Sequence, residues 1–162
     1  MVLSSGKSRL YVFNAFVHSL EFEDICKSYG ILRGIESFLE PRDQNEDVTA
    51  FVNRFYKECM NREADIDGLN YWCKELLRGN LAGQDTAKYF LNSQEFMNRN
   101  MADTDLLRIF YYTYFDREPD DQGLDYWIKR LESGDSIENV LIAFSNSMEF
   151  KEICSRYGIK HS

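Results

Sequence analysis

Apolar residues recur along this chain at positions i, i+3, i+4 and i+7, the spacing that places side chains on one face of a helix. The pattern occurs at Phe22, Ile25, Cys26 and Tyr29; Val52, Phe55, Tyr56 and Cys59; Leu69, Trp72, Cys73 and Leu76; Leu107, Phe110, Tyr111 and Tyr114; Leu124, Trp127, Ile128 and Leu131; Ile137, Val140, Leu141 and Phe144; and Phe150, Ile153, Cys154 and Tyr157. No stretch sustains the alternation of a strand. The sequence therefore predicts an all-α fold.

The predicted helices belong to repeated sequences. Residues Ser19–Ile31, SLEFEDICKSYGI, return 128 positions later as Ser147–Ile159, SMEFKEICSRYGI, with eight of thirteen residues identical. A second motif, READIDGLNYW at Arg62–Trp72, returns 55 positions later as REPDDQGLDYW at Arg117–Trp127. Because a repeated unit usually buries its apolar face against its neighbours, residues that recur in every copy are expected to be structural.

The repeats divide the chain into one partial and two complete units. Residues 1–31 align with the rear of the last unit, so we expect them to end an earlier unit whose front is missing. Residues 32–46, with Gly, Pro and a polar run, are the expected linker. Residues 47–101 form a short-ended unit, and residues 102–162 a long-ended unit that carries the ICxxYGI extension. Each complete unit is expected to be a small antiparallel helical bundle.

Capping residues stand at the ends of the predicted helices. Asp65 and Asp120 are placed to accept amide protons at the start of the GLxYW helix. The serines of the SxEF motif are placed to do the same at the start of the helix that carries that motif. Tyr-Gly-Ile at residues 157–159 suits a Schellman ending, in which glycine takes the left-handed conformation. The remaining expected caps are Ser19, Ser93 and Ser147 at helix starts and Gly79 and Gly134 at helix ends.

The composition allows a sizeable core and disfavours two kinds of partner. Of 162 residues, 44% are hydrophobic and 15% aromatic, and the net charge is −8. Nucleic acids and anionic membrane surfaces both attract basic patches, so we expect neither as a partner. The longest aromatic and apolar run, Ile109–Phe115, is too short to cross a bilayer, so we expect no membrane insertion.

No residue pattern assigns a metal, a cofactor or a catalytic group. The cysteines lie on apolar stripes without a CxxC pair, so buried thiols are expected, although a disulfide stays open in a secreted protein. The Asp-rich loops at 64–68 and 119–123 match part of a calcium loop but lack its closing Glu, and helix capping explains their aspartates as well. Nucleophile elbows, phosphate-binding glycine loops and HExxH are absent. The cysteines are Cys26, Cys59, Cys73 and Cys154.

Polar and aromatic residues outside the stripes are the candidates for binding. Two tyrosines directly precede the stripe tryptophans, where their rings are expected to be partly exposed. Exposed rings beside polar groups suit a sugar-binding face and equally suit a protein partner. Two Arg-Glu dipeptides precede the Asp-rich loops, where they can fix the loop through ion pairs or clamp a polar ligand. The candidate ligand-binding residues are Tyr71, Tyr126, Arg62, Arg117, Glu63 and Glu118.

The motif RExDxxGLxYW, followed by LxxG and FxxSxEF, resembles the bacterial domain-of-unknown-function family numbered 4214 over nearly the whole chain. It is also distantly similar to phycobilisome linker domains, which are all-helical. The resemblance implies an all-α module of large extracellular or surface-associated bacterial proteins. The family has no established catalytic residues, and its association with carbohydrate-active proteins implies glycan binding only by analogy.

We therefore expect a non-catalytic extracellular binding or attachment module, with a cell-envelope or environmental glycan as its ligand. The alternative is a protein-interaction module that packs on neighbouring repeats or partner proteins, and a small hydrolase is the third hypothesis. The glycan hypothesis requires that Tyr71 or Tyr126 be exposed. The protein-interaction hypothesis requires an exposed apolar patch, especially in the partial first unit.

Overall fold

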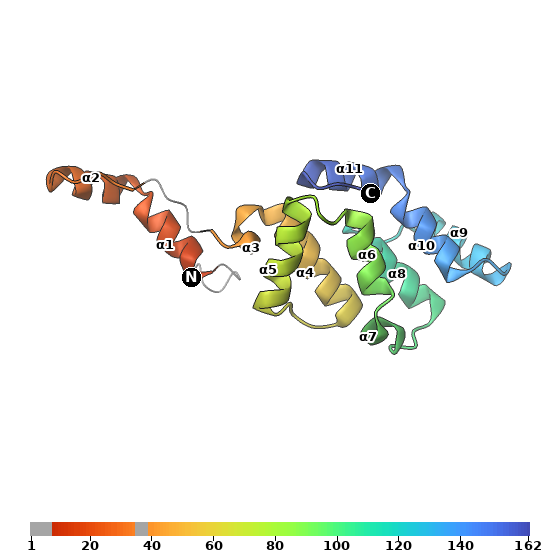
Figure 1. The fold of residues 1–162 in the computed structure, drawn as a ribbon. Helices are drawn as coiled ribbons and strands as arrows, with labels where there is room; N and C mark the ends of the chain where they lie inside the picture. Colours follow the sequence, from red (N-terminus) through yellow and green to blue (C-terminus); the bar gives the residue numbers. More distant parts are fainter. Residues whose placement is uncertain (1–7, 35–38) are drawn as a thin grey trace.

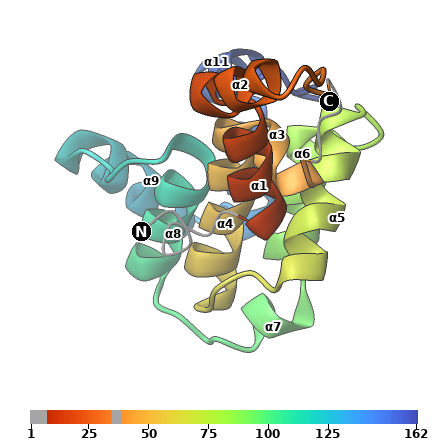
Figure 2. The same ribbon diagram turned by 90° about the vertical axis from the view of Figure 1, so that its left-hand side faces the viewer.

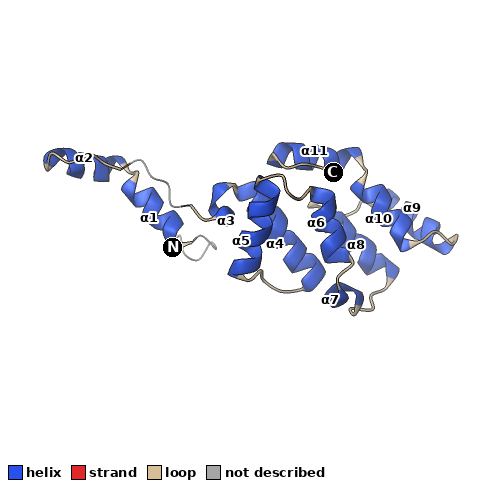
Figure 3. Cartoon of the chain, in the orientation of Figure 1, coloured by secondary structure: helices blue, strands red, loops and turns tan. Residues whose placement is uncertain are grey.

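The computed structural model describes residues 8–34 and 39–162, which form helices joined by short loops (Figure 1). The helices of these residues are α1 (Arg9–Val17), α2 (Leu20–Ser28), α3 (Pro41–Gln44), α4 (Glu46–Met60), α5 (Ile66–Leu77), α6 (Gly83–Leu91), α7 (Gln94–Met97), α8 (Asp103–Phe115), α9 (Asp121–Glu132), α10 (Ile137–Ser145) and α11 (Met148–Tyr157). These described residues contain no strand (Figure 3). The predicted all-α fold is confirmed.

The helix ends follow the predicted capping chemistry. Asp65 Oδ1 accepts a hydrogen bond from the Gly68 amide at 2.8 Å, and Asp120 Oδ1 accepts from the Gly123 amide at the same distance. Helix α11 ends at Gly158, whose φ of 71° is left-handed, as the Schellman prediction required. The serines predicted to cap helix starts, Ser19, Ser93 and Ser147, also do so. These caps are local, and the sequence was sufficient to place them.

The helices repeat as the sequence predicts. Helices α4–α7 form one unit and α8–α11 the next, with α5 and α9 exactly 55 positions apart. Helices α1 and α10 have the same bounds at a shift of 128, and α2 starts 128 positions before α11. The chain thus holds two complete units and one partial unit, which confirms the predicted repeat architecture.

The two complete units share one apolar core. Helices α4 and α8 pack against each other at its centre, and each carries one hairpin partner, α5 and α9 (Figure 1). Phe90 of α6 fills the space between α4 and α5, with its ring 5.3 Å from that of Phe55 and 5.1 Å from that of Trp72. Phe144 of α10 does the same in the second unit, 5.1 Å from the ring of Trp127. Burial of these large side chains is the main source of stability.

The C-terminal extension joins the second unit to the first. The Gly83 amide donates to the Lys160 carbonyl at 2.8 Å, and the Gln84 amide donates to the His161 carbonyl at 3.0 Å. These amides lie at the start of α6, where a helix has no internal acceptors for them. The Lys160 ammonium also donates to the Gly79 carbonyl at 2.8 Å. The extension of the long-ended unit therefore holds the two complete units together.

Helices α1 and α2 extend away from the two complete units, beyond α3 (Figure 1); Figure 2 views the molecule from that end. The Ser8 amide donates to Asp43 Oδ1 of α3 at 3.4 Å, and the Ser8 hydroxyl donates to the other carboxylate oxygen. Both side chains are buried, and the Ser8 hydroxyl also caps α1. This buried junction connects the partial unit to the rest of the fold.

Candidate functional site

The arginine of the repeated motif is held by an ion pair in both units. The Arg62 guanidinium donates to both carboxylate oxygens of Glu95, at 2.9 and 3.4 Å, and lies 5.0 Å from the ring centre of Tyr56. Arg117 makes the same fork with Glu149, at 2.6 and 2.8 Å. Donation of these hydrogen bonds to the glutamate carboxylates raises the pKa of each arginine. Both glutamates belong to the SxEF motif, so this ion pair ties two repeated motifs together.

The glycine of the same motif allows a tyrosine to approach closely. A Cβ added at Gly68 would collide with the Tyr56 hydroxyl, and one added at Gly123 would collide with the Tyr111 hydroxyl. Burial raises the pKa of both tyrosines, so their hydroxyls stay protonated. Together with the capping aspartates, these contacts give most of the RExDxxGLxYW motif a structural role.

Tyr71 of α5 and Tyr126 of α9 are exposed, as their positions before the stripe predicted. Their exposed fractions are 53% and 54%. The Tyr71 ring lies edge-on to Trp72 at 5.5 Å, whereas Tyr126 lies 5.0 Å from Trp127 and beneath the Arg130 guanidinium at 5.8 Å. The two tyrosines thus occupy equivalent places in two units, each with its own neighbours. Their role in binding stays a prediction.

Glu63 and Glu118 are also exposed, and each lies in a loop fixed by the preceding arginine. The carbonyls of Glu63 and Glu118 accept hydrogen bonds from Arg62 and Arg117 at 3.4 and 3.2 Å. The Glu118 carboxylate accepts from the Tyr112 hydroxyl, which raises the pKa of that tyrosine. The geometry favours the loop-fixing interpretation of both dipeptides, and a ligand clamp stays a prediction.

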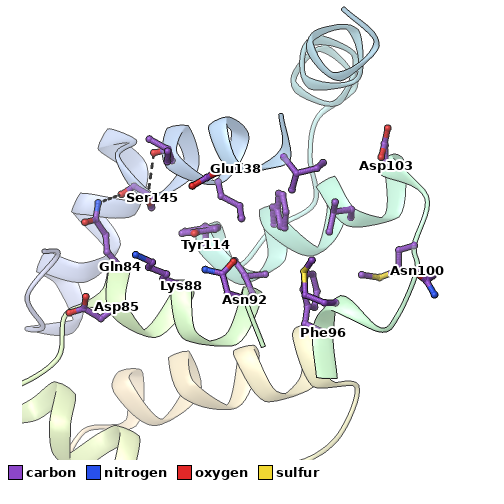
Figure 4. A pocket seen from close by; sticks show the side chains of 18 residues that line it. Gln84, Asp85, Lys88, Asn92, Phe96, Asn100, Asp103, Tyr114, Glu138 and Ser145 are labelled. Atoms are coloured by element: carbon purple, nitrogen blue, oxygen red, sulfur yellow. Dashed lines mark hydrogen bonds between the residues drawn. The ribbon is translucent and has the colours of Figure 1, made fainter. Parts of the chain in front are cut away.

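A groove of about 850 Å³ lies between the two units, and sequence reasoning did not predict it (Figure 4). Its apolar lining includes Phe110, Tyr114 and Leu141, and burial raises the pKa of the Tyr114 hydroxyl. The side-chain amide of Gln84 closes one end of the groove: its Nε2 donates to the Ser145 carbonyl at 3.0 Å (Figure 4). The exposed charged residues of the lining are Asp85, Lys88, Asp103 and Glu138. Residues from both units line this groove, so only the packing of the units reveals it.

A second surface, on α1 and α2, is the apolar patch that the protein-interaction hypothesis required. We call it the N-terminal apolar surface; its residues are Val12, Phe16, Ile25, Tyr29 and Ile31. These side chains are 36% to 78% exposed. The same five residue types stand 128 positions later, where each is at most 8% exposed. Those buried equivalents are Val140, Phe144, Ile153, Tyr157 and Ile159.

The cysteines are buried, as the sequence predicted, and all four are free in the structure. Burial raises the pKa of Cys59 and of Cys154 to about 12 and also raises the pKa of Cys73. Within residues 8–34 and 39–162, no group of three or more His, Cys, Asp or Glu side chains is placed to hold a metal ion. Across the same residues, every helix is too short or too polar to span a membrane.

Comparison with known families also finds two tandem copies, although the boundary between the copies lies inside α6 and not between α7 and α8. Two adjacent segments, residues 34–86 and 87–154, match the family model described as Domain of unknown function (DUF4214). These segments make up most of the chain, and the chain belongs to this family. Helices α1 and α2 lie outside both segments. Searches of curated proteins and of solved structures found no match.

Proposed function

We propose that this chain is a non-catalytic module that assembles with other proteins through the N-terminal apolar surface. One contrast carries the proposal: Phe16 is 57% exposed, whereas Phe144, at the equivalent position, is 1% exposed. Large apolar side chains exposed close together on a folded protein usually mark an interaction site, because leaving them in water is unfavourable. The patch spans both α1 and α2.

The chemistry of the titratable groups supports a non-catalytic role. A thiol with a pKa near 12, as in Cys59 and Cys154, stays protonated at neutral pH and is a weak nucleophile. The arginines of the repeated motif are already paired with Glu95 and Glu149. The buried thiols and the paired arginines thus support a structural role for these groups.

Self-association of the purified chain tests the proposal. An uncovered apolar surface should make the sedimentation coefficient rise with concentration between about 1 and 200 µM, the range in which weak interfaces are populated. Phe16→Ser should suppress this rise. Leu20→Ser is the matched control, because Leu20 and its equivalent Met148 are both exposed. A chain that neither self-associates over this range nor binds the hairpin peptide described below would contradict the proposal.

Glycan binding is the second candidate, supported by the exposure of Tyr71 and Tyr126 at equivalent positions. Flat aromatic rings offer apolar stacking surfaces, and the tyrosine hydroxyls add hydrogen bonds. An extracellular location on a bacterial surface belongs to this candidate and rests on the family resemblance. A glycan array should then detect binding that is lost in Tyr71→Ala and Tyr126→Ala but kept in Ile66→Ala. Absent binding, or binding unchanged in both tyrosine variants, would refute it.

A further inference from the structure

We infer that the N-terminal apolar surface is the docking site for a two-helix hairpin of the α8–α9 type, supplied from outside this chain. The inference rests on the proposed function and names the chemistry of its partner. Its basis is the internal repeat, because the five residues of the N-terminal apolar surface have identical residues 128 positions later, in α10–α11 and just beyond. One copy is covered and the other is exposed. In the covered copy the α8–α9 hairpin packs on Phe144, whereas Tyr157 packs on Phe51 of α4, so the covered copy shows what fits around Phe16.

In the covered copy, Phe144 of α10 inserts into a cage of aromatic rings from the α8–α9 hairpin. The rings lie between 5.1 and 5.9 Å from that of Phe144 and belong to Phe110, Tyr111, Tyr114, Phe115 and Trp127. In the exposed copy, Phe16 lies against Phe22 of α2 at 5.5 Å. The surface around Phe16 therefore matches an aromatic hairpin of this type.

Charge supplies a second element of recognition. Glu149 of α11 accepts hydrogen bonds from the guanidinium of Arg117, which lies in the loop between α8 and α9. The residue equivalent to Glu149 in α2 is Glu21, and it is exposed. A docking hairpin that carries the RE motif would bring its arginine to Glu21. The apolar surface and this carboxylate thus occupy the same positions of the repeat as their equivalents in α10–α11.

The hairpins within this chain are already covered. Phe90 of α6 packs on the α4–α5 hairpin, and Phe144 of α10 packs on the α8–α9 hairpin. A second copy could accept α1–α2 only by releasing its own α10–α11. In that exchange the five residues of the N-terminal apolar surface would become buried, and the five equivalent residues of the second copy would become exposed. The exchange would therefore bury no additional apolar surface. The occupant is therefore an uncovered hairpin that lies outside residues 8–34 and 39–162.

Binding of a labelled hairpin to the full chain tests the inference. The probe is a fluorescent peptide of residues 102–134, which spans α8 and α9, and its anisotropy is followed as the chain is added. Phe16→Ser should raise the Kd at least about thirty-fold, as truncation of a buried aromatic anchor does. Leu20→Ser is the control and should leave the Kd unchanged.

Charge reversal tests the register of docking. Glu21→Arg in the chain should weaken binding of the probe about fivefold, as expected for loss of a rim ion pair. A probe carrying Arg117→Glu should restore the affinity of that variant, which a nonspecific apolar contact would not do.

The outcomes separate this inference from the proposed function. If the probe binds and responds to Phe16→Ser and to the charge exchange, the inference stands. If the chain self-associates through the surface but the probe does not bind, or binds without regard to Phe16, the inference is overturned and the proposed function stands. If the chain neither self-associates nor binds the probe, both fail.

Discussion

Replacing Phe144 and Phe16 by alanine, one at a time, makes the same chemical change at two equivalent positions of the repeat. Phe144 is 1% exposed and touches five aromatic rings, so its loss leaves a cavity in the shared core. Truncation of a buried phenylalanine typically costs about 3–5 kcal/mol. Area gives a similar upper value, since about 200 Å² of buried ring at about 25 cal/mol per Å² is about 5 kcal/mol.

Phe16→Ala should behave differently, because Phe16 lies outside that core. Helices α1 and α2 meet the rest of the fold at the buried Ser8–Asp43 junction, so loss of a ring from α1 leaves the two complete units intact. We expect the free energy of unfolding of those units to change by less than about 0.5 kcal/mol, as for surface substitutions. Trp72 and Trp127 both lie in the complete units, so their fluorescence reports this transition.

Urea unfolding followed by tryptophan fluorescence measures both values. With a urea dependence of about 2 kcal/mol per M, Phe144→Ala should lower the midpoint by about 1.5–2.5 M. Phe16→Ala should leave the midpoint in place. Equal shifts for the two variants would refute the view that one copy is covered and the other is not. So would a shift for Phe144→Ala of less than about 0.5 M.

Further predictions concern the repeated motif and the thiols. Gly68→Ala should lower the free energy of unfolding by about 1–3 kcal/mol in urea titrations, because the added Cβ would meet a tyrosine hydroxyl of α4. Gly34→Ala, where the added Cβ would meet nothing, is the control and should change the free energy of unfolding by less than about 0.5 kcal/mol. Glu149→Gln should cost up to about 1 kcal/mol at low salt and less at 1 M salt, since its ion pair is partly exposed. Cys26 should react before the other thiols with Ellman's reagent, because α1–α2 can open without the complete units; simultaneous reaction of the thiols would contradict this. Stability, measured as the urea midpoint, should fall as pH rises above about 9. Cys59 has a folded pKa of about 12, so its thiol ionises at a lower pH in the unfolded state than in the folded state. Cys59→Ala should lessen that fall.

Local features of this fold could be predicted from the sequence. The apolar spacing predicted the helices, because the spacing itself places side chains on one face. Asp65 and Asp120 cap the helices they were expected to cap, because a cap involves a hydrogen bond only three residues away. The buried cysteines followed from their place on the apolar stripes.

Features that depend on packing between distant residues could not be predicted. Leu69 of α5 and Leu124 of α9 occupy the same motif position, yet Leu69 is buried and Leu124 is half-buried, because α3 packs on α5. The partner of Arg117 was also out of reach, since Glu149 lies 32 residues further along the chain. Arg54 is a third case: it is buried against the Thr113 carbonyl at 3.1 Å.

The candidate binding surfaces also divide into features that local sequence predicts and features that depend on packing between distant residues. The exposure of Tyr71 and Tyr126 followed from their offset from the stripe, which is a local property. The groove between the units is lined by α6 and α7 of one unit and by α8 and α10 of the next, and no local pattern encodes how these helices meet. The apolar patch on the partial unit was predicted from the alignment of the repeats, because the alignment shows which helices that unit lacks.

Hydroxyl-radical footprinting of the full chain tests the central claim most directly, because it reports the solvent exposure of equivalent side chains in one sample. Without the α8–α9 peptide, Phe16 should be oxidised many times faster than Phe144. When the peptide is added, the oxidation of Phe16 should slow towards that of Phe144, and the oxidation of Leu20 should not change. Equal protection of Phe16 and Phe144 in the absence of the peptide would contradict the claim, and so would a Phe16 rate that the peptide leaves unchanged.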